Sequence, residues 1–209
     1  MKRGLKAAAP ARAKSAPSGR KSAKPVRARI KAGVPSGKTG AARAQIAVET
    51  LDPAWRQVAP GVATLARKAA HAALAAALPP GPRAELALAL GDDALLRRLN
   101  RDYRGRDKPT NVLSFPYVAT PGAPEQGRRF LGDVAIARET LLAEAVAESK
   151  PAAHHLSHLI VHGVLHLLGH DHERPAEARR MEALERKVLA GLGIPDPYRP
   201  RRAPRPRRH

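Results

Sequence analysis

The sequence has no cysteine and few aromatic residues: its 209 residues include two Phe, one Trp and three Tyr. The lack of cysteine excludes a disulfide framework, a cysteine-based zinc knuckle, an iron–sulfur cluster and a thiol nucleophile. Any metal must therefore be held by nitrogen and oxygen ligands. The scarcity of rings argues against a module that stacks bases on an aromatic sheet. No apolar run approaches the roughly 20 residues of a membrane span, so we expect a cytoplasmic protein with no membrane association.

Acidic residues are absent from both ends of the chain. Residues 1–45 carry 13 Lys and Arg and residues 199–209 carry six Arg, so the ends hold nearly all of the formal net charge of +20. Both segments are also poor in large apolar residues, which favours disorder. We expect a disordered basic arm over 1–43, a domain over 44–198 and a disordered Arg/Pro-rich tail over 199–209. The arms are either solubilising extensions or sequence-independent phosphate binders; an organellar transit peptide is the third and least favoured interpretation.

The nearly neutral middle has the size of one ordinary domain. Apolar alternation predicts four strands, and helical periodicity with capping signals predicts helices before, between and after them. The fold class is therefore α+β, a single domain with a small four-stranded mixed sheet packed against helices. The third and fourth strands are expected to pair as a hairpin. The predicted strands are 44–51, 85–90, 109–116 and 131–137, and the predicted helices are 60–78, 92–103, 138–149, 152–168 and 176–192.

Histidine is concentrated in one segment, because seven of the nine histidines lie between residues 154 and 172. His162 and His166 are one helical turn apart and can share an ion. Gly169 can end the helix in the left-handed conformation and turn the chain back, which would bring His172 to the same ion. The turn geometry favours His172 over His170 as the third ligand.

Three converging imidazoles with an open fourth position are typical of catalytic zinc. Such an ion lowers the pKa of its bound water and polarises a substrate oxygen. Zn²⁺ is the default, one per chain, although Ni²⁺, Cu²⁺ and Co²⁺ also suit imidazole. Of the other histidines, His158 and His170 are either supporting residues or solvated, and His154 and His155 are interpreted as bystanders.

The ligand spacing matches that of the metzincin zinc peptidases, which carry a glutamate general base directly after the first histidine. Here that position is Gly163. Without a base, peptide hydrolysis by that mechanism has no proton acceptor, so a peptidase is the weaker hypothesis.

A second group of residues precedes the third predicted strand, in the segment LNRDYRGRDKPTNVLSFP. Arg104 on a helix end beside a sheet can grip a phosphate with two donors. From this fragment alone, a surface ion pair of Arg104 with Asp102 or Asp107 explains the residue better.

The order of NRDYRGRDKPTNVLSFP, LGDVAIA, HGVLHLLGHDH and MEALE closely resembles the YbeY family of bacterial rRNA maturation endoribonucleases, over residues 46–198 but not over the basic ends. The resemblance implies an α+β domain with a four-stranded sheet and a bound metal, usually zinc, held by His162, His166 and His172. It also implies that Arg104 is the functional arginine. Two positions depart from the family pattern, His170 where Tyr is common and Asn111 where many members have Asp; neither is one of the three implied ligands.

The resemblance implies a metal-dependent endoribonuclease that prefers single-stranded RNA and acts in maturation of the 16S rRNA 3′ end and in ribosome quality control. Its partners would be ribosomal RNA and the small ribosomal subunit, with the basic arms contacting RNA phosphates. In this hypothesis Arg104 is catalytic, because it holds the phosphate and stabilises charge in the transition state. The alternative from another class is a non-catalytic ribosome assembly factor with a mainly structural metal. Asp133 and Ser114 are each either site residues or structural ones.

Overall fold

The computed structural model describes residues 44–79, 83–118 and 128–199. The predicted basic arm 1–43, all of the predicted tail except Arg199, and most of the predicted loop between the third and fourth strands lie outside these residues. The described elements, in chain order, are β1 (Ala44–Thr50), a short 3₁₀ helix η1 (Pro53–Gln57), α2 (Val62–Ala77), β2 (Arg83–Gly91), α3 (Asp93–Arg104), β3 (Val112–Pro116), β4 (Arg128–Ala137), α4 (Arg138–Ala147), α5 (Ala152–Leu167) and α6 (Pro175–Gly191).

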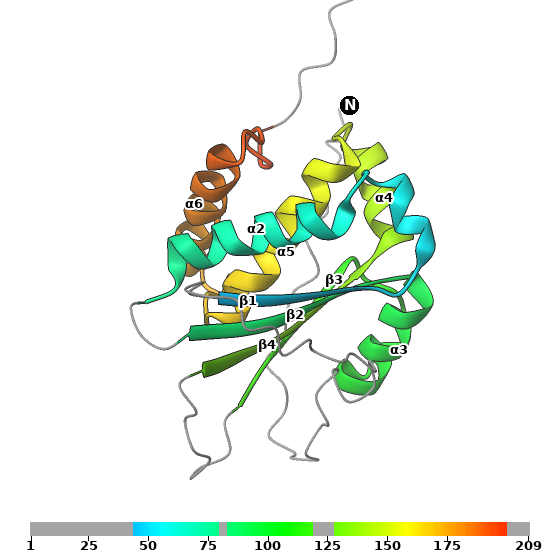
Figure 1. Cartoon of the computed structure of the whole chain (residues 1–209), viewed down its shortest axis with the longest axis horizontal. Coiled ribbons are helices and arrows are strands. Elements are labelled where there is room, and N and C mark those ends of the chain that lie inside the picture. Colours follow the sequence, from blue (N-terminus) through cyan, green and yellow to red (C-terminus); the bar gives the residue numbers. More distant parts are fainter. Residues whose placement is uncertain (1–43, 80–82, 119–127, 200–209) are drawn as a thin grey trace, which may run out of the picture.

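The four strands form one mixed sheet in the order β1-β2-β4-β3. β1 pairs with β2 and β2 with β4 in parallel, whereas β3 and β4 are antiparallel. The predicted mixed sheet and the predicted hairpin pairing are both confirmed. β1 and β3 are the edge strands, and β3 lies between the helices of the two faces (Figure 1).

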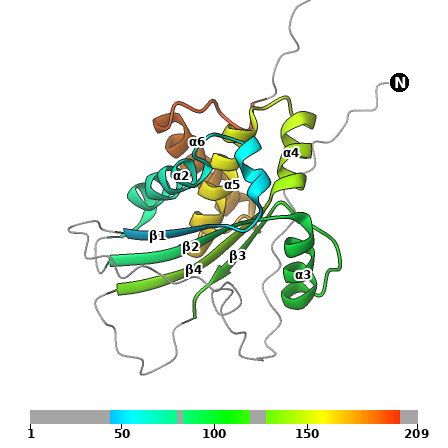
Figure 2. The ribbon, with the colours of Figure 1, turned by 45° about the vertical axis from the view of Figure 1, so that its right-hand side comes forward.

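Helices cover the two faces of the sheet unequally. Alternating residues of β2, namely Leu86, Leu88 and Leu90, face one large apolar core that also contains residues of α2, α4, α5 and α6. α3 packs on the opposite face, where Leu96 and Leu99 meet Leu113 in a smaller cluster. Figure 2 shows the same division, with α3 separated by the sheet from the other helices.

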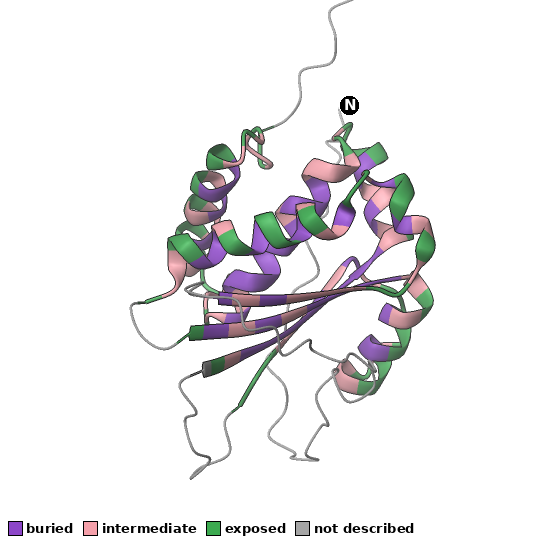
Figure 3. Cartoon of the chain, in the orientation of Figure 1, coloured by how far each residue is buried: buried purple, intermediate pink, exposed green. Residues whose placement is uncertain are grey.

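α5 is the most deeply buried helix described (Figure 3). It crosses the sheet between α2 and α6 and contributes Leu156, Ile160, Val164 and Leu165 to the large core, all with no exposed surface. Because this helix also carries most of the histidines, the histidine segment is part of the core and not a surface tract.

Local signals account for some of the element boundaries. The Asp92 side chain accepts a hydrogen bond from the Leu95 amide at 2.7 Å, which is the expected N-cap. The third strand begins at Val112 and not at Pro109, because the Asn111 side chain accepts the Val112 amide at 2.7 Å and Lys108 instead accepts a bond from Asn100. β2 and β4 are longer than predicted, and η1 is not anticipated by the sequence pattern.

None of the helices in the described ranges is both long enough and apolar enough to cross a membrane.

Candidate metal centre

Three histidines meet at the carboxyl end of α5. His162 and His166 come from the last two turns of the helix, and Gly169 then adopts a left-handed backbone with φ of 88°. The His170 amide donates to the Leu165 carbonyl at 3.0 Å, which turns the chain back over the helix end. Asp171 accepts the His172 amide at 2.7 Å and so holds the next turn of the loop. The predicted reversal of the chain therefore places His172 beside the two helical histidines.

One nitrogen of each of these three side chains lies within 4.8 Å of the others, a grouping that can hold a metal ion. The Nε2 atoms of His162 and His166 are 3.1 Å apart. Two imidazole nitrogens bound tetrahedrally to zinc at 2.0–2.1 Å would be about 3.3 Å apart, so this pair has the spacing of two ligands of one ion. His170 is not part of the group.

Glu185 of α6 supports the group from behind. Its side chain is completely buried, and its Oε1 atom lies 2.8 Å from Nδ1 of His162. Burial alone would raise the pKa of this carboxyl, but the hydrogen bonds from His158 and His162 and their charges together lower it well below its usual range. The ionised carboxylate accepts from Nδ1–H of His162, and the Nε2 atom of the same ring faces Nε2 of His166. A histidine held in this way by a carboxylate is the usual arrangement at metal sites.

The protonation state of His166 also suits a ligand. Burial, followed by the charges of His162 and His172, lowers the pKa of His166 to about 4. The ring is therefore neutral at physiological pH, which is the form that binds a metal.

Glu185 lies in the segment MEALE, and the sequence pattern assigns it no role. A signal was present, because Met181, Glu185, Val188 and Leu189 form the buried stripe of α6. An acid within an apolar helical stripe needs a buried partner, but the spacing alone does not say which one.

The remaining histidines have separate surroundings. His158 lies one turn before His162, and its Nε2 atom is 3.1 Å from Oε2 of Glu185. His155, interpreted from sequence as a bystander, is buried and its Nε2 atom is 2.8 Å from Oε2 of Glu144. That pair ties α5 to α4 and is structural.

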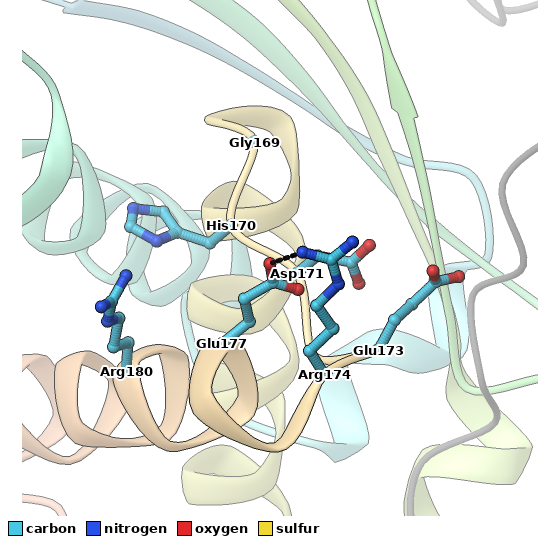
Figure 4. Close-up of a pocket in the computed structure, with 7 residues that line it drawn as sticks. All are labelled: Gly169, His170, Asp171, Glu173, Arg174, Glu177 and Arg180. Atoms are coloured by element: carbon cyan, nitrogen blue, oxygen red, sulfur yellow. Dashed lines mark ion pairs between the residues drawn. The ribbon is translucent and has the colours of Figure 1, made fainter.

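A groove of about 450 Å³ lies beside the centre. Figure 4 shows His170 and Arg180 at one side of it and Glu173 at the other, with Arg174 and Glu177 paired between them at 3.9 Å. The groove is lined by Gly169, His170, Asp171, Glu173, Arg174, Glu177 and Arg180. His170 therefore lines a polar groove next to the three-histidine group.

Gly163 faces the sheet and not the histidines. A Cβ atom on it would lie 2.7 Å from Cγ1 of Val134 and 3.2 Å from the Ser114 hydroxyl oxygen. The Ser114 hydroxyl donates to the Gly163 carbonyl at 3.2 Å, so Ser114 fixes the contact between β3 and α5. In this fold the sheet thus occupies the space beside residue 163, the position at which metzincins carry their general base.

Arg104 is the last residue of α3, on the face of the sheet opposite to α5. The two acids that could have paired with it are taken by other arginines: Asp107 binds Arg97 at 2.8 Å and Asp102 lies 3.5 Å from Arg101. Within the described ranges Arg104 makes no hydrogen bond or ion pair. Burial, followed by the nearby charge of Arg106, lowers the pKa of its guanidinium, although an arginine side chain stays protonated in proteins.

Asp133 is buried on β4. By strand alternation its side chain shares the sheet face of Ala135, which packs against α3. It therefore points away from α5 and lies outside the three-histidine group.

Known proteins of one family are similar to this chain. The sequence model of the family described as "Endoribonuclease YbeY" matches residues 53–193. The "Endoribonuclease YbeY" of Nitrobacter hamburgensis is 62% identical over 119 residues, which are 56% of this chain and 63% of that protein. The protein of the same name from Azorhizobium caulinodans is 53% identical over 158 residues, 74% of this chain and 96% of that protein.

A solved structure also shows a likeness. The solution structure of TM1509 from Thermotoga maritima has a TM-score of 0.45 and 18% sequence identity, over 74% of this chain and 99% of that one. Since the family match spans well over half of the sequence and includes all three histidines, Glu185 and Arg104, this chain belongs to the YbeY endoribonuclease family.

Proposed function

We propose that residues 44–198 form a metal-dependent endoribonuclease that prefers single-stranded RNA and acts on ribosomal RNA, in maturation of the 16S rRNA 3′ end and in ribosome quality control. The observation that carries the proposal is the convergence of His162, His166 and His172, with the Nε2 atoms of the first two 3.1 Å apart. We place this activity in the cytoplasm, on the small ribosomal subunit.

The three histidines would hold one divalent transition metal, for which Zn²⁺ is our first choice and Ni²⁺ the second. The donor set fits such an ion, because one nitrogen from each of the three imidazoles lies within 4.8 Å of the others and the His166 ring is neutral. When bound, such a metal supplies Lewis acidity toward a phosphate oxygen and lowers the pKa of a bound water.

The chain's own residues supply orientation and charge. Glu185 holds the His162 ring through Nδ1 at 2.8 Å, so that ring is preorganised. Arg104 is a half-buried guanidinium with no partner among the described residues, and a phosphate oxygen is the kind of acceptor that would satisfy it. We propose that Arg104 is the catalytic arginine, which grips a phosphate of the RNA and stabilises charge in the transition state.

Arg104 and the histidines belong to helices on opposite faces of the sheet, with the edge strand β3 between them. For Arg104 to act on the phosphate that the metal polarises, that phosphate must lie at this edge, within reach of both. A flexible single strand can bend one phosphate into such a position more easily than a stiff duplex, which supports the proposed substrate preference.

The metallopeptidase alternative is not favoured. Gly163 occupies the position of the missing general base, and a side chain there would collide with Val134. An RNA cleavage assay distinguishes the endoribonuclease from a non-catalytic assembly factor.

The test uses the purified full chain, its metal content and cleavage of a single-stranded RNA. His166→Ala should remove the metal and the cleavage together, and Arg104→Ala should keep the metal and lose at least tenfold in cleavage. Arg101→Ala is the matched control, because this exposed arginine of the same helix only pairs with nearby acids. Cleavage by both test variants at the parent rate would assign the activity to a contaminant. Metal and RNA binding without any cleavage product would identify an assembly factor.

A further inference from the structure

The chain folds back over α6 after that helix ends. Gly193 has a left-handed backbone with φ of 74°, and the Ile194 amide donates to the Leu189 carbonyl at 2.9 Å. We call residues 194–199 the C-terminal turn. Lys150 donates to the carbonyl of Pro197 at 2.6 Å, which fixes the turn against the segment between α4 and α5. The turn is therefore held at its middle by a residue from another part of the fold.

Tyr198 is the residue of the C-terminal turn that reaches inward. Its ring lies 5.2 Å from the Arg186 guanidinium and 5.6 Å from the His158 ring. The residue is 38% exposed, yet its hydroxyl donates a hydrogen bond to Oε2 of the fully buried Glu185. The hydroxyl is the donor because burial, followed by the adjacent carboxylate, raises the Tyr198 pKa well above its usual value.

The two oxygens of Glu185 have different partners. Oε2 interacts with the Tyr198 hydroxyl and with Nε2 of His158 at 3.1 Å, whereas Oε1 interacts with Nδ1 of His162 at 2.8 Å. Two groups from different elements thus hold one oxygen and fix the plane of the carboxylate. The orientation of the other oxygen, and with it the His162 ring, follows from that plane.

We propose that Tyr198 is a positioning residue for the three-histidine group, acting through Glu185 on His162. The inference rests on the proposed metal site and adds a residue outside it. A carboxylate that is itself hydrogen-bonded holds a ligand histidine better than a free one, and loss of such supporting partners commonly costs 10–100-fold in metal affinity. Tyr198 is one contact further out, so we expect a loss of roughly three- to tenfold.

The experiment is a titration of the full-length protein with Co²⁺, followed by its visible absorption bands and by competition with a chelator. Tyr198→Phe removes only the hydroxyl and keeps the ring against Arg186 and His158. Tyr117→Phe is the matched control, since it removes the hydroxyl of a tyrosine that directly follows β3 and is 47% exposed. We expect Tyr198→Phe to weaken Co²⁺ binding by roughly three- to tenfold and Tyr117→Phe to leave it unchanged.

A second arm separates positioning from mere attachment of the C-terminal turn. If Tyr198 acts through Glu185, the losses from Tyr198→Phe and Glu185→Gln should not add in the double variant. Additive losses, or a Tyr198→Phe protein that binds Co²⁺ as the parent does, overturn the inference while leaving the metal site in place. A parent that binds no Co²⁺, or whose binding survives His166→Ala, overturns the metal site and this inference with it.

Discussion

Replacement of Gly163 by alanine tests how closely α5 must approach the sheet. The added Cβ would stand 2.7 Å from Cγ1 of Val134 and 3.2 Å from its Cγ2. Carbon atoms in good contact are about 3.5–4.0 Å apart, so either α5 or β4 must move by roughly 1 Å. Val134 has no exposed surface and lies in the large core, so the displacement has no free space to enter.

The expected change in stability is the difference of two effects. Overpacking of a core by one methyl group typically costs about 1–3 kcal/mol, whereas alanine in place of glycine inside a helix gains about 1 kcal/mol. Gly163→Ala should therefore lower the free energy of unfolding by about 1 kcal/mol. Because α5 also carries His162 and His166, the same displacement should weaken Co²⁺ binding.

Gly191 provides the matched control, because it lies at the end of α6 and a Cβ there meets nothing within 4 Å. Gly191→Ala has only the propensity effect and should stabilise the protein by up to about 1 kcal/mol. Urea unfolding of the two metal-free variants should differ by about 1–3 kcal/mol, which isolates the packing cost. Equal stability of the two variants would refute the close contact between α5 and the sheet.

Two further predictions concern acid stability and the basic arm. Hydrogen bonds from Arg138 and from the Ala54 amide lower the pKa of Asp52 below its usual 3.8. The Asp52 carboxylate therefore stabilises the fold above about pH 4, and this stabilisation is lost as the pH falls through the pKa that Asp52 has in the folded protein. Arg138→Met should reduce this acid-dependent loss, measured by thermal unfolding between about pH 2 and 6; an unchanged acid limb would contradict the assignment. Deletion of residues 1–43 should weaken the salt dependence of RNA binding. The slope of the logarithm of the binding constant against the logarithm of the salt concentration should fall by about 0.7 for each lost phosphate contact, while the metal content stays the same. Loss of metal on this deletion would show that the arm belongs to the domain.

The sheet could be predicted from the sequence because its strands carry simple patterns of apolar residues. The alternation in ELALAL predicts β2, and its leucines do face the large core. Asp92 also caps α3 as expected. The strand order was not accessible, because the parallel pairing of β2 with β4 depends on how two distant segments meet across the intervening α3 and β3.

The candidate site was accessible where its residues share one segment and less so elsewhere. The spacing of His162, His166 and His172 around Gly169 is sufficient to suggest that they meet. The role of Glu185 depends on α6 packing beside α5, which no local pattern reveals. Likewise, whether Arg104 pairs with Asp102 or Asp107 depends on which other arginines bind these acids. In this fold Arg101 and Arg97 bind them.

The order of the chain has a consequence for its synthesis. All four strands precede Arg138. By contrast, α5, which fills the core over the sheet, begins at Ala152 and carries His162 and His166 of the three-histidine group. Glu185 and Tyr198 follow later still. Since a chain emerges from the ribosome amino end first, the completed sheet would await its main covering helix, and the support of His162 would arrive last. A nascent chain that stalls before Tyr198 would thus have the histidines but not their full support.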